Sequence, residues 1–538
     1  MPIERRLGAG LLLAWLLAGG FLLFAASQPP VSRTQEARVL ETAREMAELP
    51  VNDWGIPRLN GAERLRKPPL AYWLSASSFR LFGVSDFTGR LPVTLLAWLT
   101  LGSTFLVARQ LYDGRTAFFA AAVLLSSWLG MKSAIVAETD GLVAAFLTLG
   151  VFAVLRAFDA RPGRDVIWQH LGAVCCALTV LAKGPPAIYL VIFMTGLCAI
   201  RQDWRPMSRF FRTGAVTTLL VIAVPWFVYV ARHSTQEGQL GTDLLNSAEG
   251  GDHHGPPWDY LPMLLQATLP WTGVWLAALW SALFAMWRQW QTRGPRVGRS
   301  GLFVVSIWAL SMLVPLCCWG NKQLQYLVPV MPPTAILVGW ALTGVIGKRA
   351  WATAVTVATF ITAGILVVIG LASIAVTLAV RSQASGSLTG GDAALVTAIF
   401  GLAVWTALRW RAGRRHGVTA SLVLAAGVML IPLAWLPNAT GGRGRNAAIE
   451  VVTEYPHASF YFRGTELPVM SWTMRRAVPL LPEDKIESKT AEPNSVILEQ
   501  QQDDEPYPTA PKGFRRDQEI RQRENVLHVY VPEKKSEG

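Results

Sequence analysis

The chain has 538 residues, of which 52% are hydrophobic and 16% charged, and its mean hydropathy is +0.33. This balance agrees with a protein that crosses a membrane many times. The formal net charge of +13 does not indicate nucleic-acid binding, because most of the excess falls on loops between apolar stretches. Basic loops of that kind set orientation and meet anionic headgroups. We therefore expect membrane lipids, and no nucleic acid, among the partners.

Thirteen apolar stretches are predicted to cross the membrane as helices, each needing about 20 residues. They comprise residues 7–27, 89–111, 116–134, 140–158, 168–182, 186–200, 213–232, 268–288, 301–319, 326–347, 351–380, 393–410 and 418–436. The two shortest are separated by the sequence KGPP at 183–186, which predicts a tight hairpin. The alternative is one long broken helix, which would reverse the orientation of everything downstream.

Lys and Arg fall on every second loop. With a cytoplasmic N-terminus, 21 positive residues lie on the inside, against 5 in the short outside loops: Lys132, Lys183, Arg232, Lys322 and Arg381. The positive-inside rule therefore favours this orientation and the hairpin. An odd number of crossings then places residues 437–538 in the periplasm, with the helices in the cytoplasmic (inner) membrane.

The predicted fold class is an all-α polytopic membrane protein of about 13 transmembrane helices with a small C-terminal α/β domain. Residues 1–347 hold nearly all the unusual outward-facing polar residues, and residues 348–436 supply additional, plain apolar helices. Residues 437–538 turn polar and contain the strand-like runs AIEVV, SFYF, SVILE and NVLHVYV, with a frayed end after Lys534. All five cysteines lie in or at the ends of apolar spans, so no disulfide framework is expected.

Residues 34–88 are expected to form interfacial helices on the outside. The segment TQEARVLETAREMAE at 34–48 predicts a helix in the interface plane, because one stripe gathers Ala37, Leu40, Ala43 and Ala47. A solvated face is the ordinary reading of most charges in this helix. Glu36, at the end nearer the first span, is the exception that we select.

Two other outside residues invite a functional reading. Lys67 precedes two prolines that stiffen the backbone, which suits binding of a lipid phosphate; a lysine that simply reaches the headgroups is the alternative. Asp140 stands at the outer mouth of the fourth span, where an ionised carboxylate is costly unless it is paired or lies in a watery cavity. Helix capping by Thr139 and Asp140 explains the sequence equally well, and Glu138 could equally be the solvated neighbour.

Lys183, Lys322 and Tyr326 lie in other short outside loops, where lysines are on the wrong side to be topology signals. An outward-facing basic cavity that contains a carboxylate accounts for them. Such a cavity suits group transfer from a membrane-embedded phosphate carrier, because cations stabilise the leaving phosphate and a carboxylate takes a proton from a hydroxyl acceptor. The triplet Asp252-His253-His254 is the candidate for a divalent metal, but its spacing is equally that of a polar loop.

Six sequence blocks in order resemble the bacterial lipid-linked-sugar glycosyltransferases of the GT-C fold, the aminoarabinose transferase relatives of the protein O-mannosyltransferases. The resemblance covers about residues 1–347. The blocks are QEARVLETAREM, RKPPLAYWL with FRLFGVSDFTGRLP, AETDG, LAKGPPAIYLV, HHGPPWDYLP and NKQLQYLVPVMPP. The resemblance implies that Lys67 and Lys183 contact polyprenyl phosphate, with Lys322 and Tyr326 as partners, and that Asp140 belongs to the active-site cavity.

The chain departs from the family pattern at two places. The first outside loop of the family begins with an Asp-Glu pair, whereas this chain has Gln35-Glu36. Since glutamine cannot act as a base, three readings stay open: Glu36 or Asp140 takes the role, the acceptor is already a nucleophile, or activity is lost. The family also has an acidic residue where Arg66 stands, which argues against a metal at that position, and His253 matches a family histidine without an assigned ligand role.

These features predict a glycosyltransferase that moves a sugar from a polyprenyl-phosphate donor to a lipid A-like glycolipid or a protein on the periplasmic side, with inversion. The catalytic residues would be Asp140 and Glu36, and the substrate-binding residues Lys67, Lys183, Lys322, Tyr326 and Arg66. No cofactor is required by the pattern, and a divalent metal ion stays open. A secondary transporter or flippase is the alternative; it predicts charges in mid-span and repeat-related halves. A non-catalytic scaffold is the third reading.

Overall fold

The computed structural model describes most of the chain. The described residues are 2–161, 163–235, 253–293, 300–347, 353–366, 401–402, 404–413, 442–492, 494–502, 508–522 and 525–533, with the single positions 242, 368, 417, 418, 421 and 425. Half of each predicted span at 351–380 and 393–410, most of the span at 418–436 and the whole predicted frayed end after Lys534 therefore lie outside the described residues.

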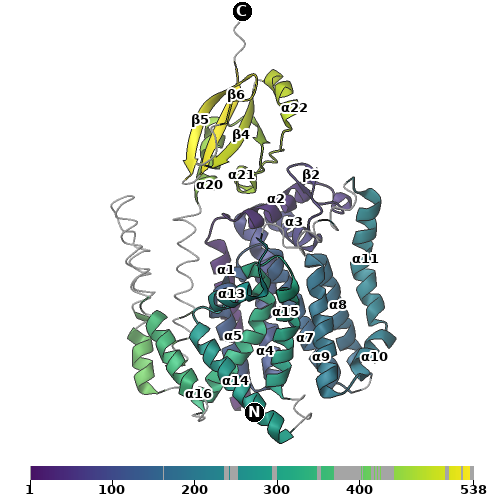
Figure 1. The fold of residues 1–538 in the computed structure, drawn as a ribbon, viewed down its shortest axis with the longest axis vertical. Helices are drawn as coiled ribbons and strands as arrows, with labels where there is room; N and C mark the ends of the chain where they lie inside the picture. The colour runs from purple at the N-terminus through teal and green to yellow at the C-terminus, as the bar shows by residue number, and fades with distance from the viewer. Residues whose placement is uncertain are drawn as a thin grey trace, which may run out of the picture.

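The described part is a bundle of apolar helices that carries a small sheet domain at one end (Figure 1). Six described helices are long and apolar enough to cross a membrane, or up to eight if each sharply bent pair counts as one span. The bundle elements are α1 (Pro2–Ser27), α4 (Asp86–Leu111), α5 (Gly114–Ser126), α6 (Trp128–Ala134), α7 (Thr139–Asp159), α8 (Asp165–Lys183), η2 (Pro185–Ala187), α9 (Ile188–Arg201), α10 (Arg205–Arg212), α11 (Ala215–His233), η4 (Pro257–Asp259), α13 (Tyr260–Ala267), α14 (Thr272–Arg293), α15 (Gly301–Cys318), η6 (Leu324–Val330) and α16 (Met331–Ile346). The predicted fold class of a polytopic helical protein is confirmed.

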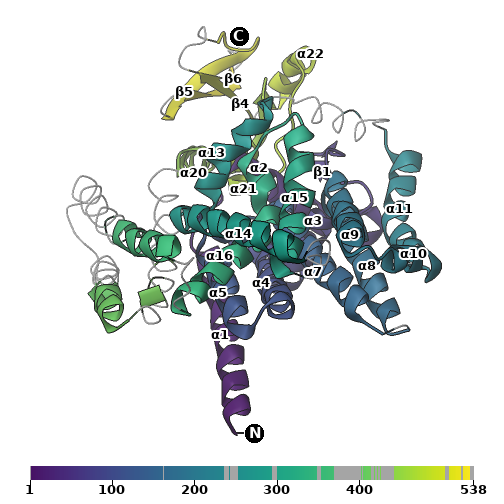
Figure 2. The ribbon, with the colours of Figure 1, turned by 60° about the horizontal axis from the view of Figure 1, so that its bottom comes forward.

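Breaks in these helices follow from local sequence. Helix α8 ends at Lys183 because Gly184 has a φ of +81°, which glycine adopts without a Cβ penalty, and Pro185 cannot continue the hydrogen-bond ladder. The predicted span at 116–134 is bent, since α5 and α6 meet at 72°. Directly before the predicted span at 268–288, the η4–α13 segment meets α14 at 117°. Helix α1 stands at the edge of the bundle beside α4 (Figure 2).

One end of the bundle, called here the capped end, is covered by α2 (Thr34–Glu48), η1 (Val51–Asp53), the hairpin of β1 (Arg58–Leu59) and β2 (Ala62–Glu63), and α3 (Leu70–Phe82). The hairpin turn is Asn60-Gly61, in which both residues have positive φ, as a two-residue turn of this kind requires. Both turn N–H groups donate to the Glu45 carboxylate.

Helix α2 has the predicted range, and its apolar stripe is covered by other parts of the protein. Ala37, Leu40 and Ala43 are fully buried, and α2 packs between α3 and a helix of the C-terminal domain. The helix is amphipathic because protein, rather than lipid, covers its apolar stripe. Sequence alone does not distinguish these two coverings.

The C-terminal domain contains α20 (Gly442–Glu454), β3 (Ser459–Arg463), α21 (Pro468–Met474), α22 (Glu483–Ile486), η8 (Glu487–Ala491), β4 (Ser495–Gln502), β5 (Phe514–Gln522) and β6 (Asn525–Pro532). Its sheet has the order β3-β4-β6-β5, with β3 and β4 parallel and the other pairs antiparallel. Three of the four predicted strands are present. AIEVV is helical instead, because Ala447, Ala448 and Val451 form one buried face at helical spacing.

Asp86 joins this domain to the bundle. Its carboxylate accepts hydrogen bonds from Trp472 Nε1 at 3.0 Å and Arg475 Nη2 at 2.8 Å, both at the end of α21, and from the Val31 N–H at 3.2 Å. The Trp472 ring also stacks on Phe79 of α3. A single carboxylate at the first turn of α4 therefore connects three segments that are far apart in the sequence.

We expect Asp86→Ala to loosen the C-terminal domain, because each hydrogen bond to a charged group contributes about 1.5–3 kcal/mol. Limited proteolysis of the purified protein should release residues C-terminal to about 441 faster than in the wild type, while the helical bundle stays intact. Asp53→Ala removes an exposed carboxylate at the same end and serves as the control. Equal cleavage rates for Asp86→Ala and wild type would contradict the assigned role of Asp86.

Candidate active site

A cavity of about 210 Å³ lies near the capped end of the bundle. It is bounded by the first turns of α7, the turn between α8 and α9, η6 and the loop that precedes α3. Its polar lining consists of Arg66, Lys67, Asp140, Lys183, Tyr189 and Tyr326. The remaining wall is apolar, including Val143, Phe227, Leu316 and Trp319. This arrangement suits an amphiphile with an anionic head.

Rigid turns place the two lysines of the cavity. Lys67 is followed by Pro68 and Pro69, whose fixed φ angles determine how the chain enters α3. Lys183 is the last residue of α8, directly before the Gly184 turn. Five of the predicted site residues, Arg66, Lys67, Asp140, Lys183 and Tyr326, thus line one cavity, although they come from four distant parts of the chain.

Asp140, Lys183 and Tyr326 form a tight cluster. Lys183 Nζ donates to Asp140 Oδ1 at 2.5 Å, and the same ammonium lies 3.8 Å from the centre of the Tyr326 ring. The side chains of Asp140 and Lys183 are 6% and 17% exposed, so the pair is largely removed from water. The helix dipoles favour it, since Asp140 is in the first turn of α7 and Lys183 in the last turn of α8.

Lys67 is a half-buried cation of this cavity with a lowered pKa. Burial, together with the nearby charge of Lys183, lowers the pKa of Lys67 to about 8. Asp140 and Glu138 act in the opposite direction. At pH 7 the ammonium form still predominates, so Lys67 can contact an anion, and an arriving anion would further favour that form.

Glu36 lies outside the cavity lining and is held in a different role. Arg90 of α4 donates to both of its carboxylate oxygens, at 2.6 and 3.0 Å, and the Ala137 N–H donates to Oε1 at 3.0 Å. Arg90 also donates to the Ala26 and Pro29 carbonyls. Both charged side chains are at most 2% exposed. Glu36 therefore anchors the chain three residues before Asp140.

Lys322 is likewise engaged by protein groups. Its ammonium donates to the carbonyls of Leu316, Cys317 and Trp319 at the end of α15, which matches its three protons. The Lys322 backbone N–H donates to the His253 carbonyl at 2.9 Å. Lys322 is 5% exposed and does not line the cavity. Its placement indicates a cap on α15 rather than a contact with substrate.

The predicted metal triplet is only partly described, since Asp252 lies outside the described residues. His253 and His254 are exposed, and His254 pairs by its backbone with Asn321. Within the ranges given above, no three His, Cys, Asp or Glu side chains gather in a way that could hold a metal ion. Arg66 occupies the family's acidic position. The described residues of this region therefore do not form a set of metal ligands.

Sequence reasoning missed the surroundings of Glu138. The sequence leaves open whether Glu138 is the solvated neighbour of Asp140; its side chain is 12% exposed and lies 3.3 Å from Arg33 Nη2. Tyr189, which lines the cavity from the first turn of α9, was also missed. The only available signal for Glu138 was its place directly before an apolar span. That place fits both a solvated and a buried carboxylate.

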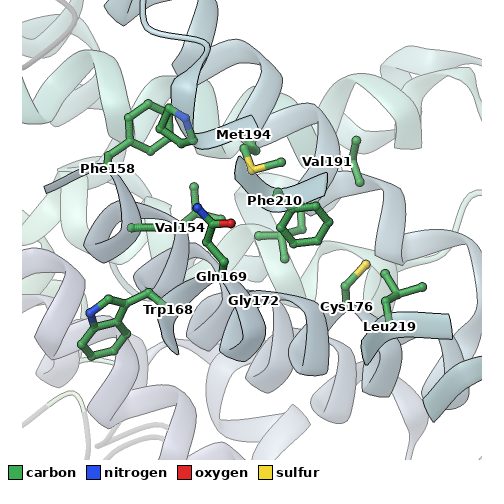
Figure 3. A pocket seen from close by; sticks show the side chains of 13 residues that line it. Val154, Phe158, Trp168, Gln169, Gly172, Cys176, Val191, Met194, Phe210 and Leu219 are labelled. Carbon is green, nitrogen blue, oxygen red and sulfur yellow. The ribbon is translucent and has the colours of Figure 1, made fainter. Parts of the chain in front are cut away.

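A second cavity, between α7, α8, α9, α10 and α11, is apolar. Its volume is about 50 Å³, and Figure 3 shows the Gln169 amide among side chains such as Phe158, Met194 and Phe210. That amide is already bonded, to Asp165 and to Thr213. The lining holds no charged residue, so it offers no chemistry for group transfer.

The fold is shared with a solved membrane protein. ArnT from Cupriavidus metallidurans in the apo state superimposes with a TM-score of 0.73 at 19% identity, covering 97% of this chain and 98% of that one. Its structure bound to undecaprenyl phosphate gives a TM-score of 0.72. At this identity the likeness establishes the fold.

Sequence comparisons agree with the fold. Residues 66–229 match the family of dolichyl-phosphate-mannose-protein mannosyltransferases. The undecaprenyl phosphate-α-4-amino-4-deoxy-L-arabinose arabinosyl transferase of Edwardsiella ictaluri is 25% identical over 457 residues, 82% of this chain and 80% of the relative. In sequence and in fold, the chain is thus similar to glycosyltransferases that use a lipid-phosphate-linked sugar.

Other relatives align over a shorter region. The aminoarabinosyl transferase 1 of Sodalis glossinidius is 29% identical over 323 residues, which is 56% of this chain and 53% of the relative. The chain thus spans about half the length of that relative. The matched family region, residues 66–229, contains Lys67, Asp140 and Lys183 of the cavity.

We expect Glu36→Gln to destabilise the protein strongly. The substitution leaves the buried Arg90 charge uncompensated, and breaking such a pair costs about 3–5 kcal/mol. Thermal unfolding of purified protein in detergent, monitored by size-exclusion chromatography, should show a lower unfolding midpoint. Glu48→Gln, which removes a 67% exposed partner of Arg44 on the same helix, should shift the midpoint little. A wild-type midpoint for Glu36→Gln would refute the anchoring role.

Proposed function

We propose that this protein transfers a sugar from a polyprenyl-phosphate donor to an acceptor of the cell envelope, and that the capped end faces the periplasm. The observation that carries the proposal is the convergence of Lys67, Lys183, Asp140 and Tyr326 on one amphiphilic cavity. The GT-C relatives support the donor class, because their names specify an undecaprenyl phosphate-linked sugar. The structural neighbour solved with undecaprenyl phosphate gives the same support.

The charge pattern of the loops supports the orientation. The N-terminal start of α1 lies at the end of the bundle opposite the C-terminal sheet domain (Figure 1). Arg-rich loops such as 201–212 would then face the cytoplasm, as the positive-inside rule requires. The cavity and the C-terminal domain would face the periplasm of a cell whose inner membrane holds the helices.

The cavity residues have distinct roles in this reaction. Lys67 and Lys183 contact the phosphate, and their charges stabilise the oxygen that leaves the anomeric carbon. Tyr326 holds the Lys183 ammonium over its ring, and Arg66 adds positive charge at the rim. The acceptor approaches the anomeric carbon from the face opposite the phosphate. Displacement in line with the leaving oxygen therefore inverts the configuration at that carbon.

Asp140 is the carboxylate that orients the Lys183 ammonium. The pair is compact, at 2.5 Å, and an incoming phosphate would share the Lys183 protons with Asp140. Glu36 and Lys322 are left out of the reacting groups, because their polar atoms already bond to protein. We assign both to supporting roles in the walls of the site.

The position of these charges also bears on the transporter alternative. Asp140 is the second residue of α7 and Lys183 the last residue of α8. Charges at one end of the spans suit a reaction at one membrane face. A transported solute needs polar groups near the middle of the bilayer. The arrangement therefore favours the transferase over the transporter.

Asp140→Asn should abolish sugar transfer while membrane insertion stays normal. Asparagine preserves the shape but cannot balance the Lys183 charge, so the cation is displaced from its catalytic position. Mass spectrometry of envelope glycolipids and proteins from cells with and without the gene defines the product, and a comparison of the variant with wild type measures the loss. Full activity of purified Asp140→Asn would reject the site.

The affinity for undecaprenyl phosphate should fall as the pH rises through about 8. Lys67 loses its proton there in the free protein, while the phosphate, with a second pKa of about 6, stays a dianion. Loss of one charge-assisted contact predicts a weakening of about tenfold between pH 7 and 9.5.

The control is Lys67→Arg, in which the guanidinium stays charged over this range. Equilibrium binding of undecaprenyl phosphate to protein in nanodiscs should then be nearly independent of pH. The same pH dependence in Lys67→Arg and wild type would assign the effect to another group.

A further inference from the structure

A smaller cavity of about 10 Å³, enough for one water-sized group such as a hydroxyl, also borders Asp140. Its polar lining comprises Arg33, Lys132, Ser133, Glu138, Asp140 and Gln325. Among the described residues, Asp140 is the one that lines both this cavity and the larger one. A group in the smaller cavity would therefore lie next to the donor site without competing for its phosphate contacts.

Glu138 is a largely buried carboxylate that does not cap the helix it precedes, α7. It occupies the position directly before α7, where acidic side chains often cap, yet it makes no capping hydrogen bond. Arg33 Nη2 lies 3.3 Å from Glu138 Oε1, but no hydrogen bond satisfies that oxygen. A buried acceptor in this state is costly and is retained where it has a function.

The two other carboxylates near the donor site are already engaged. Glu36 accepts three hydrogen bonds, two from Arg90 and one from the Ala137 N–H. Asp140 is bonded to the Lys183 ammonium at 2.5 Å. A proton moved to either group would disrupt an ion pair that the site needs. Protonation of Glu138 disrupts only its longer contact with Arg33.

We infer that Glu138 is a catalytic residue, the proton acceptor for a hydroxyl group that enters the smaller cavity. This inference rests on the proposed function. The acceptor O–H proton moves to the Glu138 carboxylate while the acceptor oxygen forms a bond to the anomeric carbon. The bond from that carbon to the phosphate oxygen breaks, and its electron pair leaves with polyprenyl phosphate, whose charge Lys67 and Lys183 receive. The acceptor class is a hydroxyl compound, since a phosphate is already ionised.

The charges around Glu138 suit this task. Burial raises its pKa, and the Arg33 charge opposes that rise. The carboxylates of Asp140 on α7 and Glu36 on α2 raise the pKa further, and Lys67 in the loop before α3 lowers it. Lys132 of α6 lies on the same cavity and is influenced by Glu138 in turn. A raised pKa makes a carboxylate a stronger base than an exposed one, provided that it is still ionised at the working pH.

The test compares Glu138→Gln with Arg33→Gln in the full-length protein. Membrane vesicles from gene-deleted cells that express each variant are assayed for the initial rate of envelope glycosylation, and the purified variants for binding of undecaprenyl phosphate. Glu138→Gln should lower the rate by at least about 100-fold, the usual contribution of a general base. Its affinity for undecaprenyl phosphate should stay within about twofold of wild type.

Arg33→Gln is the matched control, because it breaks the same ion pair but keeps the carboxylate. Its rate should fall by less than about tenfold. The acid limb of its pH–rate profile should move to higher pH, since loss of the cation raises the Glu138 pKa further. A purely structural ion pair would give both variants the same defect.

Three results would overturn the inference while leaving the proposed function standing. They are a wild-type rate in Glu138→Gln, equal rate losses in both variants, and a product in which the sugar is joined to a phosphate oxygen. If wild-type protein restores no glycosylated product at all, the proposed function fails and the role of Glu138 fails with it.

Discussion

The buried ion pair between Glu36 and Arg90 is the constraint on which the rest of the site depends. Removing both charges from water is costly, and it is offset here by bidentate geometry and by further bonds to the Ala26, Pro29 and Ala137 backbone. These bonds join α1, α2, α4 and the turn before α7. Glu138 and Asp140 lie one and three residues after Ala137. Glu36, which lines neither cavity, therefore fixes the segment that carries these two carboxylates.

The lysines at the capped end are similar in sequence but differ in what they can bind. Lys322 gives all three protons to carbonyls at the end of α15, where a cation also stabilises the helix dipole. Lys183 shares its charge between Asp140 and the Tyr326 ring, and Lys67 is held by two prolines at the cavity rim. The number of protein acceptors around each ammonium thus separates structural cations from those that can receive a phosphate.

Hydropathy and charge placement predicted the helical fold, the ranges of most described bundle helices and the gathering of Lys67, Asp140, Lys183 and Tyr326. Lysines on the wrong side for topology need another reason to be there. The roles of Glu36 and Lys322 could not be predicted in this way. Their partners, Arg90 and the α15 carbonyls, are fixed only by tertiary packing. AIEVV was misread as a strand for a different reason, since its buried face depends on Ala447, which precedes the apolar run.

Helix α2 couples the C-terminal domain to this site. One face of α2 packs on α3 and another on α21, and Glu36 lies in its first turn. Asp86, four residues before Arg90 on α4, holds Trp472 and Arg475 of the domain. The same two helices therefore carry both the docking contacts and the anchor of the active-site turn. A displacement of the docked domain that moves α2 must strain the Glu36–Arg90 pair, and through Ala137 it must also shift Glu138 and Asp140.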